Sequence, residues 1–163
     1  MIKRLIFLLV LIAITFSLVT SCSDGGGIFS YCEANLPLGD GFKSVSDENF
    51  DAVWSNGKYT MALLRISFVA GVSEGIAETM TPYEFGLFWL DRCARDANLI
   101  KDGSVYCEYY GFGESGAEEV FYLEAFYRSA YAYFVILFAA PAADEEAGRV
   151  DFLSYASNVY FLT

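Results

Sequence analysis

Residues 131–140 constrain the fold of this chain more than any other segment, because every side chain in the run is apolar or aromatic. The β-branched and aromatic residues favour a strand, and Pro141 marks its end. Successive side chains of a strand point to opposite faces, so both faces of this strand are apolar. Such a strand must be covered on both sides. The run therefore predicts a central strand with other layers of structure on each face of its sheet.

Other patterns place further strands around this one. Asn56-Gly57 separates two β-prone runs, residues 50–55 and 58–69, and predicts a hairpin with both turn residues at positive φ in a type I′ turn. Further strands are expected at the ranges 28–33, 105–112, 118–128 and 159–162. Turns are expected at 36–41, at 101–103 and near Ser129-Ala130, and a loop or loose crossover at 71–80.

Two helices are expected. The first begins at Thr81-Pro82-Tyr83-Glu84, a capping box with proline at the first helical position, and runs to about Asn98. The second covers residues 142–158 and has acidic residues in its first turn. The order of elements predicts an α+β fold, an antiparallel β-sheet with helices packed on it.

Helical spacing also predicts which side chains of the two helices face inward. In the first helix these are Tyr83, Leu87, Leu90, Ala94 and Ala97, and Phe85, Phe88 and Trp89 widen the apolar face. In the second helix they are Val150, Leu153 and Ala156, with Phe152 and Tyr155 beside them.

The first residues have the pattern of an export signal. Lys3 and Arg4 precede an apolar run that is shorter than the ~20 residues of a membrane-spanning helix. The stretch Val19-Thr20-Ser21-Cys22 resembles the lipobox of bacterial lipoproteins. That resemblance implies a signal-peptide helix over 1–21, diacylglyceryl transfer to Cys22 and cleavage before it. An ordinary signal peptide or an uncleaved anchor helix is the alternative.

The same resemblance implies a location and an organisation of the chain. Residues 22–28 are expected to be the lipidated cysteine and a flexible tether, and residues 29–163 a single α+β domain. The acyl chains are expected to hold the domain at a membrane of the bacterial cell envelope, the outer membrane being favoured in a cell with two membranes.

Charge and composition exclude several kinds of function. The formal net charge is −11 and becomes −13 without Lys3 and Arg4, which excludes the basic surface of a nucleic-acid-binding protein. The chain has no histidine, so Ser-His-Asp and Cys-His catalysis and histidine-based metal sites are excluded. Its 55% hydrophobic content excludes a disordered chain.

The order of elements from residue 29 to 162 resembles the Mog1/PsbP-like fold, which includes DcrB-type bacterial lipoproteins. The similarity lies in the turn-rich Leu36-Pro37-Leu38-Gly39-Asp40-Gly41-Phe42, in the apolar run up to Pro141 and in the amphipathic segment 151–161. Members of this fold are mostly non-enzymatic accessory or binding proteins, so the resemblance implies binding in place of catalysis. It implies no catalytic residue in this chain.

Cysteines and carboxylates offer few chemical sites. Cys93 and Cys107 are predicted to lie on a helix and on the following strand, where they either form a disulfide or remain as buried free thiols. The odd number left after lipidation of Cys22, with Cys32 as the third, leaves one thiol unpaired within the chain. Glu118-Glu119 and Asp144-Glu145-Glu146 lack the spacing of calcium loops, and no metal or other cofactor is expected.

Aromatic residues are the distinctive feature of the domain. They can stabilise the sheet as cross-strand pairs, or they can form a recognition surface for an envelope protein. The candidate recognition residues are Tyr106, Tyr109, Tyr110, Phe112, Tyr122 and Tyr127. The expected function is that of a lipid-anchored envelope lipoprotein that binds a partner without catalysis. A secreted hydrolase using two carboxylates and a small-ligand sensor with an apolar cavity between helix and sheet are the alternatives.

Overall fold

The computed structural model describes residues 27–112 and 118–162, so the predicted signal peptide, the lipobox and Cys22 lie outside the described residues. The described part is an α+β domain with two antiparallel sheets. Its strands are β1 (Ile28–Tyr31), β2 (Ala34–Pro37), β3 (Lys43–Val45), β4 (Ala52–Ser55), β5 (Thr60–Ser67), β6 (Ile100–Asp102), β7 (Ser104–Phe112), β8 (Glu119–Arg128), β9 (Ala132–Pro141) and β10 (Tyr160–Phe161). Its helices are α2 (Phe68–Val72), α3 (Pro82–Arg92) and α4 (Glu145–Ser157), the last preceded by a 3₁₀ turn (Ala142–Asp144).

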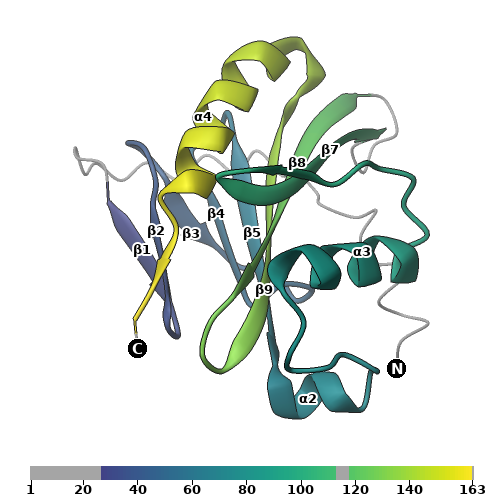
Figure 1. Cartoon of the computed structure of the whole chain (residues 1–163). Helices are drawn as coiled ribbons and strands as arrows, with labels where there is room; N and C mark the ends of the chain where they lie inside the picture. The colour runs from purple at the N-terminus through teal and green to yellow at the C-terminus, as the bar shows by residue number, and fades with distance from the viewer. Residues whose placement is uncertain (1–26, 113–117, 163) are drawn as a thin grey trace.

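The apolar run forms β9, which is the fourth of seven strands in the order β3-β4-β5-β9-β8-β7-β6 (Figure 1). Alternate side chains of β9 enter cores on opposite faces of the sheet. On one face, Phe134, Ile136 and Phe138 pack with Phe152 of α4. On the other face, Tyr133 and Val135 pack with residues of α3, and Leu137 and Ala139 lie in a third cluster with side chains of β4, β5 and β8. The predicted central strand, apolar on both faces and covered on both, is confirmed.

The N-terminal segment forms a hairpin where the sequence predicted one strand followed by a turn. Cys32, with φ of 49°, lies in the turn between β1 and β2, and β2 includes Leu36 and Pro37. Strand β10 leaves α4 and pairs with β2, so a three-stranded sheet lies beside the large one (Figure 1). Glu33 of this hairpin accepts hydrogen bonds from Arg65 of β5 and from Ser129 in the β8–β9 turn. These long-range bonds attach the small sheet to the large one and had no local signal in the sequence.

The hairpin of β4 and β5 is confirmed, but its turn differs from the prediction. Asn56 and Tyr59 form the closing pair, joined by a bond from Asn56 N to Tyr59 O of 3.1 Å. Of the turn residues only Gly57 has positive φ, at 84°. Asn56 instead uses its side-chain oxygen to accept from the backbone nitrogens of Lys58 and Tyr59. The turn therefore depends on one left-handed glycine, not on two residues in a type I′ turn.

Helix α3 starts as predicted and ends early. Thr81 and Glu84 form the reciprocal capping box, and Pro82 occupies the first turn. The helix ends at Arg92 because Ala94 takes a left-handed backbone conformation with φ of 49°. The predicted apolar face is correct in part: Leu90, Phe85 and Trp89 are buried as predicted, whereas Tyr83 and Leu87 are exposed.

The predicted inward face of α4 is also correct in part. Phe152 and Ala156 are fully buried, whereas Val150, predicted to face the core, is 67% exposed. Phe152 stacks against Phe121 and Phe138 and lies edge-on to Tyr59. The short helix α2 lies within a stretch that was predicted as the end of a strand and a loop. None of the helices in residues 27–112 and 118–162 is long and apolar enough to cross a membrane.

The phase of α4 can be tested with two substitutions on the same helix. Phe152→Ala removes a fully buried ring and is expected to lower the free energy of unfolding by about 3–5 kcal/mol. Val150→Ala, at an exposed position, is expected to change it by less than about 0.5 kcal/mol. Urea unfolding followed by circular dichroism measures both. Similar losses in the two variants would contradict the exposed position of Val150.

Candidate functional site

The six candidate recognition residues do not form one surface. Tyr110 and Phe112 are 50% and 64% exposed near the end of β7. Tyr106 and Tyr122 are each only 7% exposed. Tyr127 is partly buried, and its hydroxyl donates a 2.8 Å hydrogen bond to the carbonyl of Ala156. Most of the tyrosines therefore belong to the core, as the cross-strand alternative predicted.

The alternation of side chains along β7 explains this division. Tyr106, Tyr110 and Phe112 have the same parity and point to the face that α4 covers, and Tyr106 lies in its core. Tyr109 points to the opposite face, where it is directly across from Tyr122 in the ladder with β8. These two rings stack at 5.1 Å between centroids. Tyr110 and Phe112 lie beyond the part of β7 that pairs with β6, and both stay in contact with solvent.

Charged groups surround Tyr110. Arg149 of α4 bonds Glu108 of β7 and Glu145 of its own helix, at 2.9 Å and 2.7 Å respectively. A hydrogen bond to Glu145 raises the pKa of the Tyr110 hydroxyl. The Tyr110 ring also packs against Phe121 of β8, 5.9 Å away. The exposed aromatic pair, Tyr110 and Phe112, thus lies in an acidic surrounding with one arginine between two carboxylates.

A second polar cluster is buried below α3 and was not predicted. Glu124 of β8 is 0% exposed, and among the described residues it is the only fully buried carboxylate. Its carboxylate accepts hydrogen bonds from Trp89 Nε1 at 2.9 Å and from Arg95 Nη1. The one sequence signal for it was a lone acid within the apolar run 120–126. A charge in such a run requires an internal partner.

The surroundings of Arg95 and Glu124 satisfy both charges. The guanidinium of Arg95 lies 3.9 Å from the centroid of the Tyr109 ring, and Tyr109 also bonds Glu124. Burial raises the pKa of Glu124, although Arg95 and the hydrogen bonds counteract part of the rise. Every buried side-chain nitrogen and oxygen among the described residues has a hydrogen-bond partner. The cluster therefore fixes the loop after α3 against the sheet and leaves no polar group free for a substrate.

Cys93 and Cys107 lie at the edge of this cluster. Of the two states that the sequence allowed, the structure has the free thiols, and Cys32 is also free. Burial, followed by the charge of Glu124, raises the pKa of Cys93 to about 11 and that of Cys107 to about 12. The thiolate is the reactive form, so both side chains act as small apolar core residues in this state.

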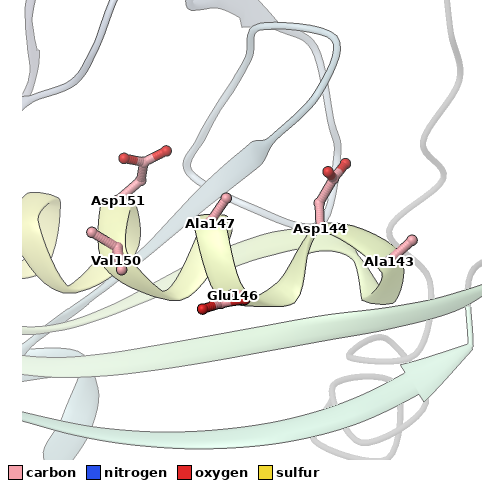
Figure 2. Close-up of a pocket in the computed structure, with 6 residues that line it drawn as sticks. All are labelled: Ala143, Asp144, Glu146, Ala147, Val150 and Asp151. Carbon is pink, nitrogen blue, oxygen red and sulfur yellow. The ribbon is translucent and has the colours of Figure 1, made fainter.

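A shallow hollow of about 520 Å³ lies against the outer side of α4. Figure 2 shows Asp144, Ala147 and Asp151 on one side of the helix, with Glu146 pointing to the other. The full lining consists of Ala143, Asp144, Glu146, Ala147, Val150 and Asp151. Within the described residues, no group of three or more cysteine, aspartate or glutamate side chains is arranged to hold a metal ion. The hollow is an acidic depression on the surface of the helix.

Comparison with known proteins identifies a fold and no family. No protein-family model matches the sequence, and no curated protein matches it. A crystal structure of a protein from Bacteroides thetaiotaomicron is similar, with a TM-score of 0.55 and 13% sequence identity over 85% of this chain. The match covers 50% of that protein, so this chain spans about half of its length. At this identity the similarity shows the α+β fold with antiparallel sheets and nothing about activity.

The buried pair can be tested with Arg95→Met. Without Arg95, Glu124 remains buried and unpaired, and its pKa rises further above the ordinary value. A folded state that binds the proton more tightly than the unfolded state loses stability as the pH rises. The variant is therefore expected to be destabilised by about 3 kcal/mol at neutral pH, and by less as the pH falls towards the ordinary carboxyl pKa.

Arg92→Met is the matched control. The ion pair of Arg92 with Glu74 is about one-third exposed on both sides, so its loss is expected to cost less than about 1 kcal/mol. Urea unfolding at neutral and mildly acidic pH compares the two variants. An Arg95→Met loss that equals the control, or that is constant with pH, would contradict the role assigned to the buried pair.

Proposed function

We propose that this chain is a lipid-anchored lipoprotein of the bacterial cell envelope whose domain binds a partner and catalyses no reaction. The observation that carries the proposal is the joint pattern of Lys3-Arg4, an apolar run and a lipobox ending at Cys22. Each part stands where the others require it. Membrane attachment is through acyl chains on Cys22, and the outer membrane is the favoured location in a cell with two membranes.

The position of the domain relative to the anchor supports this function. Strand β1 starts at Ile28, six residues after Cys22, so the tether spans at most about 20 Å. The processed chain has a net charge of −13, which disfavours direct contact with anionic lipid headgroups. The acyl chains therefore provide the attachment, and the domain is held close to the bilayer with its acidic surface free for a protein partner.

The surroundings of the acidic residues support binding over hydrolysis. A hydrolase with two carboxylates needs an accessible acid with a raised pKa next to a second carboxylate. The carboxylate whose pKa burial raises, Glu124, lies inside the core and bonds Arg95 and Trp89. The packing below α3 argues against the second alternative, a ligand cavity between helix and sheet. The rings of Phe85 and Tyr133 stack there with their centroids 4.4 Å apart, as in a filled core. No cofactor is proposed.

We also propose that the domain is related to the Mog1/PsbP-like fold in its DcrB-type form. The order of hairpin, helix, antiparallel strands, helix and short terminal strand from β4 to β10 supports this relationship. The pairing of β10 with an N-terminal hairpin is an additional feature that the resemblance did not include. Proteins of this fold mostly bind partners, which agrees with the proposed function.

Lipidation is tested by labelling cells that produce the protein with radioactive palmitate. The wild type is expected to carry the label, and Cys22→Ala is expected to lose it, because the thiol of Cys22 is the proposed acceptor. Cys32→Ala, which changes the next cysteine along the chain, is expected to keep the label. Equal labelling of the wild type and of Cys22→Ala would refute the proposed anchor.

Partner binding is tested by photo-crosslinking in intact cell envelopes. A benzoylphenylalanine in place of Phe112 is expected to give one discrete crosslinked band, since this exposed ring belongs to the proposed recognition surface. The same group in place of Tyr131, a 60% exposed residue in the β8–β9 turn, is the control and is expected to give none. Identical band patterns at the two positions would argue against a recognition surface at Phe112.

A further inference from the structure

Half of β7 has no neighbour on its outer side. Strand β6 pairs with β7 only from Ser104 to Tyr106, whereas β7 continues to Phe112. The chain before β6 turns inward at Leu99, whose side chain packs against α3 at Gly86 and so cannot extend the pairing. Among the described residues, no backbone or side-chain hydrogen bond reaches the backbone of residues 108–112 from that side. We call residues 108–112 the free edge of β7.

The register shows which backbone groups point outward from this edge. In the β8–β9 turn, Ser129 N bonds Ala132 O, which makes these residues a hydrogen-bonded pair. Such pairs alternate along antiparallel strands, so the odd-numbered residues of β8 bond β9 and the even-numbered ones bond β7. In the ladder between β7 and β8, each even-numbered residue of β8 lies opposite an odd-numbered residue of β7. The backbone groups of the odd-numbered residues of β7 therefore bond β8. Glu108, Tyr110 and Phe112 therefore direct their N–H and C=O groups away from the sheet.

The free edge lacks the usual protection of an edge strand. Natural edges are short or carry lysine, proline or a bulge that blocks further pairing. The opposite edge of the same sheet, β3, is three residues long and contains Lys43. The free edge of β7 has neither lysine nor proline, and two of its aromatic rings are at least half exposed. It is a regular extended segment whose outward N–H and C=O groups can pair with another strand.

Charge indicates which kind of strand fits. Glu108 and Glu145 share the single arginine Arg149 on the α4 side of the edge. Glu118 and Glu119, at the start of β8, add two exposed carboxylates where β7 ends, Glu119 lying across from Phe112. A second copy of this acidic chain would bring the same charges together. A cationic segment has the complementary charge, with apolar side chains to lie against Tyr110 and Phe112.

We propose that the free edge of β7 binds an extended, lysine- or arginine-rich segment of a partner protein by strand addition. Backbone bonds to Glu108, Tyr110 and Phe112 hold the segment. Its apolar side chains pack on the Tyr110 and Phe112 rings, and its cationic side chains pair with the carboxylates around Arg149. The proposal rests on the proposed binding function and names the class of partner for it.

The test uses a short capped peptide in which every second residue is lysine or valine, so that both kinds of side chain share one face, with threonine at the positions between them. It is added to the processed domain, and amide hydrogen exchange is followed by NMR. In the free protein, the amides of Glu108 and Tyr110 are expected to exchange fast, whereas that of Tyr109, bonded to β8, exchanges slowly. Added peptide is expected to protect Glu108 and Tyr110. The same peptide with N-methylated alternate residues is expected to bind at least about tenfold more weakly, because it cannot complete the pairing.

A variant pair separates backbone from side-chain contributions. Tyr110→Pro removes an outward N–H and keeps the ladder to β8, so peptide affinity is expected to fall by about tenfold or more. Tyr110→Ala keeps the N–H and removes the ring, so it is expected to lose less. A peptide with glutamate in place of lysine is expected not to bind. If Tyr110→Pro does not fold, the N-methylated peptide still tests the backbone pairing.

Several results would overturn the proposal. One is slow exchange of the Glu108 and Tyr110 amides in the free protein, because the chain itself would then fill the edge. If that protection rises with protein concentration, a second copy of the chain fills it. Another is equal binding of the lysine and glutamate peptides, and a third is no protection by the lysine peptide. The palmitate and crosslinking results are independent of this test. Peptide binding without lipidation would refute the anchor alone, and lipidation with a specific crosslink but without peptide binding would refute strand addition alone.

Discussion

Strand β9 can leave water only if both of its faces are covered, and the rest of the domain is arranged to meet this requirement. Its even-numbered residues lie in the core that includes Phe152 of α4. Of its odd-numbered residues, Tyr133 and Val135 pack with Phe85 of α3, and Leu137 and Ala139 lie in a third cluster with side chains of the neighbouring strands. Strands β5 and β8 pair along nearly its whole length and satisfy its backbone groups. The two helices and the sheet order both serve to bury this one strand.

Burial of the aromatic residues also determines what remains for binding. The stack of Tyr109 on Tyr122 and the bond from Tyr127 to Ala156 use most of the conspicuous tyrosines for the core. In the part of β7 beyond its pairing with β6, exposed aromatic rings and outward-facing backbone groups lie together. The same extension is bordered by Glu108, Glu119 and Glu145, with Arg149 as the one basic partner. The proposed recognition at this edge therefore combines backbone pairing, ring contacts and charge.

Local chemistry in the sequence was sufficient for some features and insufficient for others. The capping box at Thr81 and the turn at Ser129 depend on neighbouring residues and were predicted correctly. The buried face of α3 was predicted only in part, because Tyr83, Phe85, Leu87 and Trp89 are all apolar and helical spacing cannot choose among them. The pairing of Glu124 with Arg95 joins residues 29 positions apart, and nothing local marks Arg95 as its partner. The N-terminal hairpin likewise depends on distant bonds, from Arg65 and Ser129 to Glu33.

The sequence by itself determined the α+β class, the central position of β9 and the acidic, histidine-free composition that limits the chemistry available. These properties follow from apolar periodicity, capping and charge, which act over a few residues or over the whole chain. The tertiary structure alone decided that Leu87 of α3 and Val150 of α4 face solvent, that the thiols of Cys93 and Cys107 stay free, and that Tyr110 and Phe112 are the candidate aromatics with at least half of their surface exposed. The physical reason is that burial depends on which distant elements cover a residue, and a side chain's own type does not specify them.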